Sequence, residues 1–307
     1  MCILARQSAL LLLRIFIVFF GATGGLCTHA SEASSARKIL FIVGPSGHPP
    51  GTHEVAASAR LLKYCVEQAG EGAAFQTELH EGWPTDPATL AQARVVVFSG
   101  DQFPPKRFGK STEIFAQLSR MIEQGCSIVC VHYATSVNAR EVSSAMQSSL
   151  YRWLGGFGHF LPGNVKPGTQ ARIMEATVTP TKTGHPVTRG VAPFSLRDEP
   201  YYPIMFDPTK SGAPVTPLAT AMLPPEAPKE EIVAWSIDRG QGSRGVAVVM
   251  PHFFINWEND NLRKLVLNGI FWAAGVEVPP KGIESTLPSL ELFKPKAIRQ
   301  SQPEAKK

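Results

Sequence analysis

Three short apolar runs, separated by segments of helical periodicity, constrain the fold of this chain more than any other sequence feature. The runs KILFIVG (38–44), RVVVFSG (94–100) and CSIVCVHYA (126–134) are rich in β-branched residues and end in glycine or polar residues. Continuous apolar runs of this length are typical of strands that are buried on both faces of a parallel sheet. Such strands alternate with helices in βαβ units, whose crossovers are right-handed.

Helical periodicity is clearest in three segments that follow these runs or lie between them. Residues 54–70, 111–125 and 259–275 each place their apolar side chains on one helical face and end at a glycine, which suits a helix C-terminus. Ser111 or Thr112 is the expected N-cap of the second helix. Together with the apolar runs, these segments predict the α/β class, with a doubly wound, mostly parallel open sheet and helices on both faces.

The middle of the chain, from about residue 151 to residue 230, is less periodic and richer in Pro, Gly and Thr. Residues 171–180 alternate in polarity, which predicts an edge or antiparallel strand. Residues 210–231 are interpreted as a loop-rich excursion because prolines recur there. Residues 231–237 and 244–250 predict a pair of strands joined by a glycine-rich turn.

The 307 residues are expected to divide into three parts. Residues 1–30 combine an early arginine, an apolar run and small residues near the end, which is the pattern of an export signal. An uncleaved membrane anchor is the alternative, although the run is shorter than the ~20 residues that span a bilayer. Residues 37–275 form the α/β domain, and residues 276–307 form an extended tail rich in Pro and Lys. We therefore expect a secreted or periplasmic protein with no membrane contact after cleavage.

The formal charge of +5 is concentrated at the two ends of the chain. The predicted signal carries two arginines and no acid, and the last fifteen residues carry five basic residues against one glutamate. The body is consequently close to neutral. No basic patch suited to phosphate contacts is indicated, so we expect no nucleic-acid partner.

Histidines, carboxylates and tyrosines collect directly after the predicted strands. Ligands of open α/β sheets bind outside the carboxyl ends of the strands, so these positions are the first candidates for a site. Histidine and carboxylate together provide metal ligation or proton transfer near neutral pH. Each group alone is more often a hydrogen-bonded surface feature, but their combination predicts a site. The groups are His48, His53 and Glu54; His132 and Tyr133; His159; Asp198, Glu199 and Tyr201; and His252 with Trp257.

Several familiar catalytic patterns are absent from these segments. His48 and His53 do not form an HExxH motif, so a metal site would need ligands from separate loops. Residues 129–136 (VCVHYATS) lack a G-x-S-x-G nucleophile elbow, and Cys130 is expected to point into the sheet. Residues 44–51 (GPSGHPPG) lack the Lys-Ser/Thr end of a phosphate loop and carry prolines, which cannot donate backbone N–H groups.

Five motifs, in this order, resemble the ThuA-like, or trehalose-utilisation, family over about residues 37–285. They are HPPGTHE (48–54), VHYA (131–134), WLGG (153–156), HPVTRGV (185–191) with DEPYY (198–202), and the long segment 252–285 that begins HFFINWEND. The resemblance implies a flavodoxin-like fold within the class I glutamine amidotransferase-like superfamily and a role in carbohydrate metabolism, often in exported proteins. It also implies loss of the Cys-His-Glu triad, and therefore no glutamine amidotransferase activity.

Our first hypothesis is an enzyme, a hydrolase or isomerase, that acts on a sugar or keto-sugar derivative by acid-base or metal-assisted chemistry. His132 and Glu199 are the candidate acid and base, and Asp198 is the third catalytic candidate. The sequence does not name a cofactor; a divalent metal such as zinc is one candidate, with His53, Glu54, His132 and His252 as ligands. The candidate substrate-binding residues are His48, His53, Glu54, Tyr133, His159, Tyr201, His252 and Trp257.

Our second hypothesis is a non-catalytic carbohydrate-binding or scaffolding module that kept the amidotransferase-like sheet. Five aromatic side chains could stack on sugar rings as well as fill a core: Trp83, Trp153, Tyr201, Tyr202 and Trp257. Of these, Trp153 and Trp257 are expected in the core. A small-molecule carbohydrate is the partner in both hypotheses, and a homo-oligomer is compatible with either.

Overall fold

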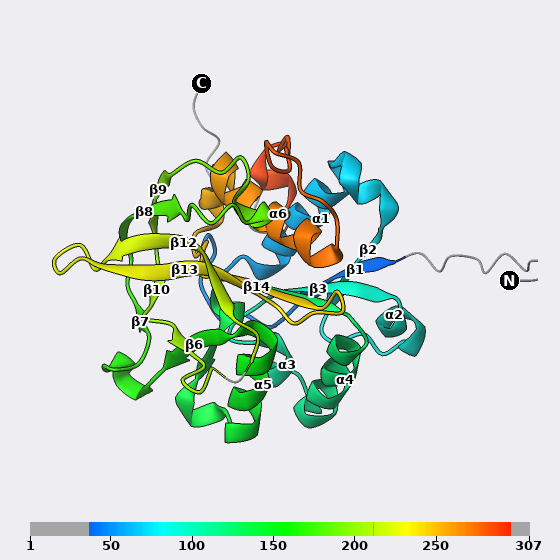
Figure 1. Cartoon of the computed structure of the whole chain (residues 1–307), viewed down its shortest axis with the longest axis horizontal. Helices are drawn as coiled ribbons and strands as arrows, with labels where there is room; N and C mark the ends of the chain where they lie inside the picture. Colours follow the sequence, from blue (N-terminus) through cyan, green and yellow to red (C-terminus); the bar gives the residue numbers. More distant parts are fainter. Residues whose placement is uncertain (1–36, 211, 296–307) are drawn as a thin grey trace, which may run out of the picture. The chain divides into compact units, whose positions relative to one another are not determined.

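The computed structural model describes residues 37–210 and 212–295 (Figure 1). The predicted export signal and the tail beyond residue 295 lie outside the described residues. The main sheet has nine strands. In spatial order they are β2 Gln76–Glu81, β1 Lys38–Val43, β3 Ala93–Ser99, β4 Ser127–Val131, β14 Arg244–Val248, β13 Lys229–Asp238, β12 Val215–Leu223, β8 Met174–Pro180 and β9 Phe194–Asp198.

One half of the sheet is parallel and is wound in both directions from β1. Strands β2, β1, β3, β4 and β14 pair in parallel with their neighbours. The chain passes from β1 to β2 on one side and then to β3 on the other, which creates a topological switch point between β1 and β3. The apolar residues of β1, β3 and β4 are buried, as expected of strands that are covered on both faces.

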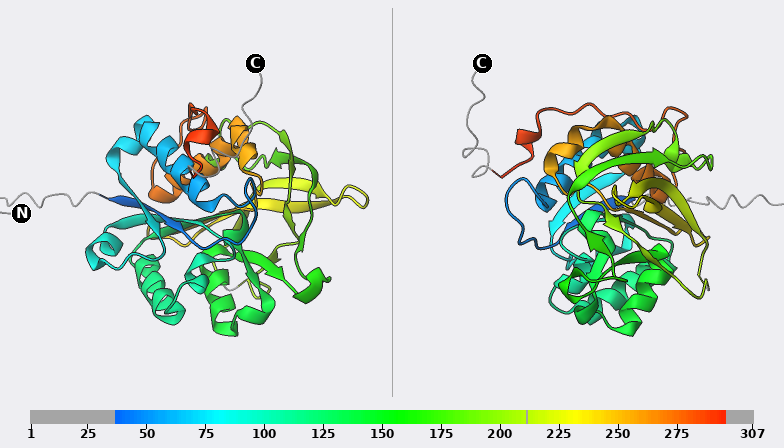
Figure 2. Two further views of the ribbon diagram at one scale, coloured as in Figure 1. Left: turned by 180° about the vertical axis from the view of Figure 1, so that it is seen from behind. Right: turned by 90° about the vertical axis from the view of Figure 1, so that its left-hand side faces the viewer.

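Helices cover both faces of this parallel half (Figures 1 and 2). Helices α1 and α6 lie on one face, and α3, α4 and α5 lie on the other. The predicted α/β class and doubly wound sheet are therefore confirmed. The helices are α1 Val55–Gln68, α2 Pro87–Ala91, α3 Pro104–Arg107, α4 Ser111–Glu123, α5 Ser144–Leu154 and α6 Asp260–Ala274.

The three predicted helices are present as α1, α4 and α6, and α6 ends at Gly275 in the left-handed conformation as expected. The N-cap prediction for α4 is wrong. Lys110, with φ of 62°, takes the N-cap position, and Ser111 is already helical. Helix α5 was not predicted; its N-cap is Ser143, whose hydroxyl accepts a hydrogen bond from the backbone N–H of Met146. In the described part of the chain no helix has the length and apolar character needed to cross a membrane.

The other half of the sheet is antiparallel. Strands β14, β13, β12, β8 and β9 pair in alternating directions, as predicted for the β13–β14 pair and for β8. The interpretation of residues 210–231 as a loop-rich excursion is wrong, because β12 lies there and is paired on both sides. Its apolar residues include Leu218 and Leu223, which are buried, and the register shifts beside Pro217. A proline at a register irregularity is tolerated in a strand, which explains why its loop signal was misleading.

Smaller elements extend this framework towards the site. Strands β5 Ser136–Asn138, β6 Gly156–Phe160 and β11 Met205–Phe206 form a three-stranded sheet, and β7 Gln170–Ala171 pairs with β10 Tyr201–Tyr202. Residues 276–295 pack on the domain through Val278, Ile283, Leu290 and Phe293, all of which are buried. The side chain of Asn268 on α6 accepts a hydrogen bond from the backbone N–H of Ile283.

Candidate functional site

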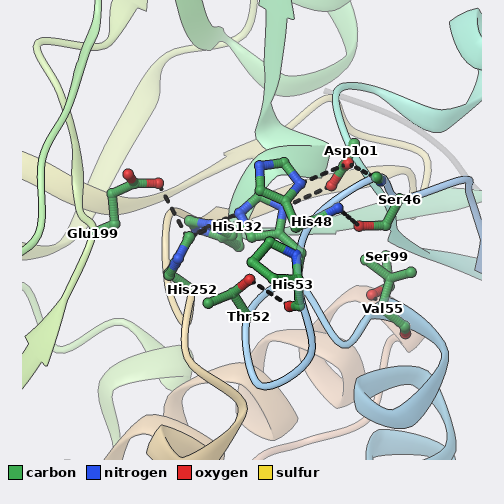
Figure 3. A network of polar contacts seen from close by, with 12 residues as sticks. Ser46, His48, Thr52, His53, Val55, Ser99, Asp101, His132, Glu199 and His252 are labelled. Atoms are coloured by element: carbon green, nitrogen blue, oxygen red, sulfur yellow. Dashed lines mark hydrogen bonds and ion pairs between the residues drawn. The ribbon is translucent and has the colours of Figure 1, made fainter.

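Three histidine side chains from separate loops meet at the carboxyl edge of the parallel half (Figure 3). His53 lies in the loop after β1, His132 directly follows β4, and His252 follows β14. The Nε2 atom of His53 lies 2.9 Å from Nδ1 of His252 and 3.0 Å from Nε2 of His132. The Nε2 atom of His132 lies 3.3 Å from Nδ1 of His252. All three residues are buried, so the ring nitrogens face one another in a site largely closed to water.

The hydrogen bonds made by the Nδ1 atoms of His53 and His132 determine which ring nitrogen carries the proton. Nδ1 of His53 is 2.6 Å from Oδ1 of Asp101, and Nδ1 of His132 is 2.9 Å from the carbonyl oxygen of Val249. Since both partners are acceptors, each Nδ1 must carry the proton, and each Nε2 therefore presents a lone pair. Two lone pairs at 3.0 Å cannot form a hydrogen bond with each other. They are the arrangement that a shared cation would stabilise.

Burial keeps these rings neutral. It lowers the pKa of His132 well below its usual value, and the nearby His53 ring acts in the same direction. Burial also lowers the pKa of His53, and the hydrogen bond that His53 donates to Asp101 acts in the opposite direction. Neutral imidazoles are the form that binds metal ions.

The spacing of the three nitrogens fits a metal-binding arrangement. With bonds of about 2.05 Å to zinc, two tetrahedral nitrogen ligands lie about 3.3 Å apart and two octahedral ones about 2.9 Å apart. The observed separations of 2.9 to 3.3 Å cover this interval. Oε2 of Glu199 lies 3.2 Å from Nδ1 of His252 and can supply an oxygen ligand. Three imidazoles and one carboxylate, with ligand atoms within 4.8 Å of one another, form a set suited to zinc or another first-row divalent ion.

The backbone at two of these histidines is in the left-handed region. His53 has φ of 39° and His132 has φ of 49°. Such conformations cost energy for residues other than glycine and cluster at functional sites. His132 begins the 3-10 helix η2 (His132–Thr135) directly after β4, so it occupies a strand-to-helix turn of the kind that carries the nucleophile in hydrolase elbows. Here the turn presents an imidazole instead.

The cysteines of the described chain are not placed for nucleophilic chemistry. Cys130 lies within β4 and is fully buried, and burial raises the pKa of its thiol strongly. Burial also raises the pKa of Cys65 to about 11 and that of Cys126 to about 12. Thiolates are the reactive form, so these side chains are inert at neutral pH.

Asp101 is a functional residue that the sequence analysis missed. Its Oδ1 contacts His53, and its Oδ2 lies 2.8 Å from Nδ1 of His48, whose ring stacks on His53 with centroids 3.6 Å apart. Burial alone would raise the pKa of Asp101, but the hydrogen bond from His53 and that from the backbone N–H of Gly47 bring it down to about 2. Asp101 follows β3 by two positions, so the rule that points to residues after strands could have found it.

Two glycines allow the loops that carry these side chains to approach each other. Gly44 follows β1 and Gly100 follows β3. A Cβ atom added to Gly100 would lie 2.8 Å from Cα of Gly44, closer than a real contact. Gly44 and Gly100, which end the first two apolar runs, therefore have a steric role, because they let the loops bearing His48 and Asp101 lie side by side.

The carboxylate of Asp198 connects the segments that carry Glu199 and His252. Its buried carboxylate accepts hydrogen bonds of 2.7 Å from the backbone N–H groups of Glu199 and His252, and a third of 2.7 Å from the side chain of Asn256. Burial raises its pKa, while these hydrogen bonds act in the opposite direction. Asp198 was predicted as a catalytic residue; in the structure its oxygens accept hydrogen bonds from these three donors and so hold the loops of Glu199 and His252 together.

Two tyrosines complete the surroundings of the cluster. The hydroxyl of Tyr201 lies 3.0 Å from Nε2 of His132, and its ring stacks on His132 with centroids 4.6 Å apart. Burial raises the pKa of Tyr201 well above its usual value, so the hydroxyl stays protonated and can donate a hydrogen bond. The ring of Tyr133 lies 5.5 Å from that of His53.

Three predicted site residues lie apart from this cluster. Glu54 uses Oε1 to accept a hydrogen bond of 2.8 Å from the backbone N–H of Gly51. The carboxylate that joins the three histidines in the group able to hold a metal is Glu199 and not Glu54. His159 lies on β6 with its ring next to Phe157. Trp257 is fully buried and donates a hydrogen bond of 2.9 Å to Ser58, which makes it a core residue.

One family model and several solved structures match this chain. The model for ThuA, described as trehalose utilisation, matches residues 38–273. No match was found among curated proteins. A putative ThuA-like protein from Bacteroides uniformis ATCC 8492 is 16% identical, with a TM-score of 0.55 over 81% of this chain and 95% of that protein. This likeness shows a shared flavodoxin-like fold.

Two sugar-acting enzymes show weaker similarity. A cold-adapted β-galactosidase from Rahnella sp. R3 is 13% identical, with a TM-score of 0.48 over 77% of this chain and 30% of the enzyme. The carbohydrate deacetylase Agd3 is 12% identical, with a TM-score of 0.46 over 78% of this chain and 32% of the enzyme. In both cases the matched region is only about a third of the larger protein.

Proposed function

Because this chain belongs to the ThuA, or trehalose-utilisation, family, whose name indicates a carbohydrate-related role, we propose that it is a metal-dependent enzyme acting on a sugar or keto-sugar derivative. His53, His132, His252 and Glu199 are the proposed ligands of a divalent ion such as zinc. The observation that carries the proposal is the pair of Nε2 lone pairs of His53 and His132, which face each other at 3.0 Å. Hydrogen bonding within the protein does not account for that contact, whereas metal ligation does.

The chain's own residues would then have distinct tasks in a hydrolysis or isomerisation. A divalent ion held by these residues would act as a Lewis acid, which would polarise a sugar oxygen or lower the pKa of a bound water. Glu199, whose side chain is 20% exposed, is the carboxylate best placed to accept a proton from the substrate side. Tyr201 stays protonated and can donate a hydrogen bond to a substrate oxygen. His132 is neutral with Nδ1 committed to Val249, so we assign it to metal binding rather than to acid catalysis.

Metal content tests this proposal directly. We expect elemental analysis of the purified protein to find one divalent ion per chain, and we expect His53→Ala and His132→Ala to lose it. His80→Ala is the matched control, because His80 lies on β2 and pairs with Glu78 outside the cluster. A folded wild-type protein that binds no zinc, cobalt, nickel, copper or manganese in titration would overturn the proposal.

The alternative, a non-catalytic carbohydrate-binding module, makes a different prediction. Four of the five aromatic side chains considered for sugar stacking are buried: Trp153, Tyr201, Tyr202 and Trp257. This burial weakens the case for an open stacking surface built from those residues. Incubation of the metal-loaded protein with sugars and keto-sugars, followed by NMR, separates the two functions, because an enzyme converts a sugar over time and a binding module does not.

We further propose that the protein is exported, and a homo-oligomer is compatible with the proposed function. Support for export comes from the pattern of residues 1–30 alone. N-terminal sequencing of the protein recovered from the exported fraction would identify cleavage near residue 30, and an intact N-terminus in the cytoplasmic fraction would contradict it. Light scattering of the purified protein measures whether more than one chain is present.

A further inference from the structure

The four proposed metal ligands differ in their access to solvent. The side chain of Glu199 is 20% exposed, whereas those of His53 and His252 are 1% and 8% exposed, and His132 is also buried. In Figure 3, Glu199 approaches the cluster from the side of His252, opposite to Asp101. Protein atoms therefore enclose the three imidazoles, and the carboxylate of Glu199 is the proposed ligand that water can reach most easily.

The four side chains also differ in how firmly they are held. His53 and His132 each donate a hydrogen bond from Nδ1 to an acceptor outside the cluster. His252 is held through its backbone, whose N–H donates to Asp198 at 2.7 Å and whose carbonyl oxygen accepts from the N–H of His53 at 2.9 Å. Within the described part of the chain, the one polar partner of the Glu199 carboxylate is Nδ1 of His252, at 3.2 Å. Since outer-shell partners orient metal ligands, Glu199 is the least firmly oriented of the four.

The cluster in this arrangement has no position for a substrate. Four protein ligands would fill the tetrahedral set of a zinc ion, as in structural zinc sites, whereas catalytic sites keep one position for water or substrate. The cavity that His53 and His132 line together measures about 20 Å³, which is room for about one water molecule. An enzyme built on this site must therefore release one of the four side chains before a substrate oxygen can take a ligand position.

We propose that Glu199 is an exchangeable ligand, which leaves its position when an oxygen ligand or a small anion enters from solvent. The bond from Oε2 of Glu199 breaks, the bond from the entering ligand forms, and the three histidines remain in place. The released carboxylate is then available to accept a proton from the entering group. The inference rests on the proposed function for the presence of a metal ion. It goes beyond that function in assigning the position at which the substrate enters.

Azide binding to the cobalt(II)-loaded protein tests this assignment, because the visible absorption of cobalt(II) changes with its ligands. We expect azide to bind Glu199→Ala about tenfold more tightly than the wild type, since no carboxylate competes for the position, with Glu199→Gln between the two. At saturating azide, the spectra of the wild type and Glu199→Ala should coincide, because Glu199 is absent from the ion in both. Glu258→Gln changes an exposed carboxylate at the end of η6 (Phe254–Glu258) and is the control, with azide affinity like that of the wild type.

Three results would overturn the assignment of Glu199. They are equal azide affinity in the wild type and Glu199→Ala, no azide binding to the wild-type protein, and a saturated wild-type spectrum that differs from that of Glu199→Ala and shows azide as an additional ligand. The last comparison also separates ligand exchange from the simple loss of a negative charge, which changes affinity but does not make the two spectra coincide.

Cobalt and zinc titrations of the wild-type protein, made first, separate this inference from the proposed function. If the metal binds and azide does not show the expected order, the exchange of Glu199 is refuted and the metal site stands. If neither metal binds to the folded wild-type protein, the proposed function is refuted, and the exchangeable ligand with it.

Discussion

The two halves of the nine-stranded sheet contribute to the candidate site in different ways. The parallel half supplies the three histidines and Asp101 from loops that follow β1, β3, β4 and β14. The antiparallel half supplies Asp198, Glu199 and Tyr201 from the end of β9 and the segment after it. In a parallel sheet the carboxyl ends meet at one edge automatically, so nitrogen ligands collect there without special contacts. The antiparallel half reaches the same place because β9 runs in the same direction as β14 and because Asp198 binds the loop of His252.

This difference suggests that the two halves have different roles in the proposed site. Under the proposed function, the parallel half would provide the nitrogen ligands, and the antiparallel half would provide the carboxylate of Glu199 and the hydroxyl of Tyr201 beside them. We therefore expect substitutions in the two halves to affect metal binding and turnover to different extents.

The largest effect should come from removing one ligand in each half. We expect His132→Ala to weaken zinc affinity by more than about 100-fold, since even the loss of an outer-shell partner costs 10–100-fold. Glu199→Gln keeps an oxygen atom near His252, so its zinc affinity should fall by only about tenfold while turnover is largely lost. Competition with a chelator measures the affinity. Equal losses of affinity in the two variants would remove the proposed distinction between the halves.

A smaller effect is expected from the two carboxylates that orient the ligands. In the parallel half, Asp101→Asn weakens the hydrogen bond that His53 donates to residue 101. In the antiparallel half, Asp198→Asn disturbs the clamp formed by the hydrogen bonds that Asp198 accepts from the backbone N–H groups of Glu199 and His252. Each should lower zinc affinity by about tenfold, at the lower end of the range for outer-shell partners, and turnover of the metal-loaded protein should fall less than in Glu199→Gln. Asp260→Asn, which changes an exposed carboxylate on α6, is the control. Retention of full zinc affinity in Asp198→Asn would show that the clamp is not needed for the metal site.

The sequence predicted the members of the site better than their arrangement. Residues after strands are recognisable because apolar runs end abruptly, which is why His53, His132 and His252 were found. The exchange of Glu54 for Glu199 could not be predicted, because it depends on the hydrogen bond from Gly51 to Glu54 and on the path of β9 beside His252. The path of β9 depends in turn on β12, through β8; β12 contains Pro217 and is flanked by further prolines, a pattern typical of a loop. Contacts between distant segments are the information that periodicity does not contain.

A third prediction compares the pH dependence of stability in the two halves. Burial lowers the pKa of His185, in the antiparallel half, from 6.5 to about 4. The unfolded chain therefore takes up this proton first as the pH falls, and stability decreases from pH 6.5 towards pH 4. In the parallel half, the low pKa of Asp101 gives stability that is lost only below about pH 3.8.

Chemical denaturation of the metal-free protein at several pH values tests this order. We expect His185→Gln to reduce the loss of stability between pH 6.5 and pH 4.5 by roughly 1 kcal/mol, allowing for solvent screening of a partly exposed ring. Asp101→Asn should leave the slope contributed by His185 unchanged in that interval. An unaltered slope in His185→Gln would show that other groups, including His53 and His132, account for the acid sensitivity.

The smallest effect is expected from Cys130→Ala. This substitution tests whether a side chain inside β4 contributes to function, in contrast to His132 directly after the strand. Cys130 is fully buried two positions before His132, and burial raises the pKa of its thiol so far that it does not ionise at neutral pH. Removing its sulfur leaves a small cavity that should cost about 1 kcal/mol of stability. Zinc affinity and turnover should match the wild type, since the proposed metal site uses His132, the residue after the strand, and not Cys130. A Cys130→Ala protein that is folded and binds zinc but has lost turnover would instead point to chemistry by the thiol. In that case Cys130, and not His132, would be the residue of β4 and its following turn that matters most for turnover.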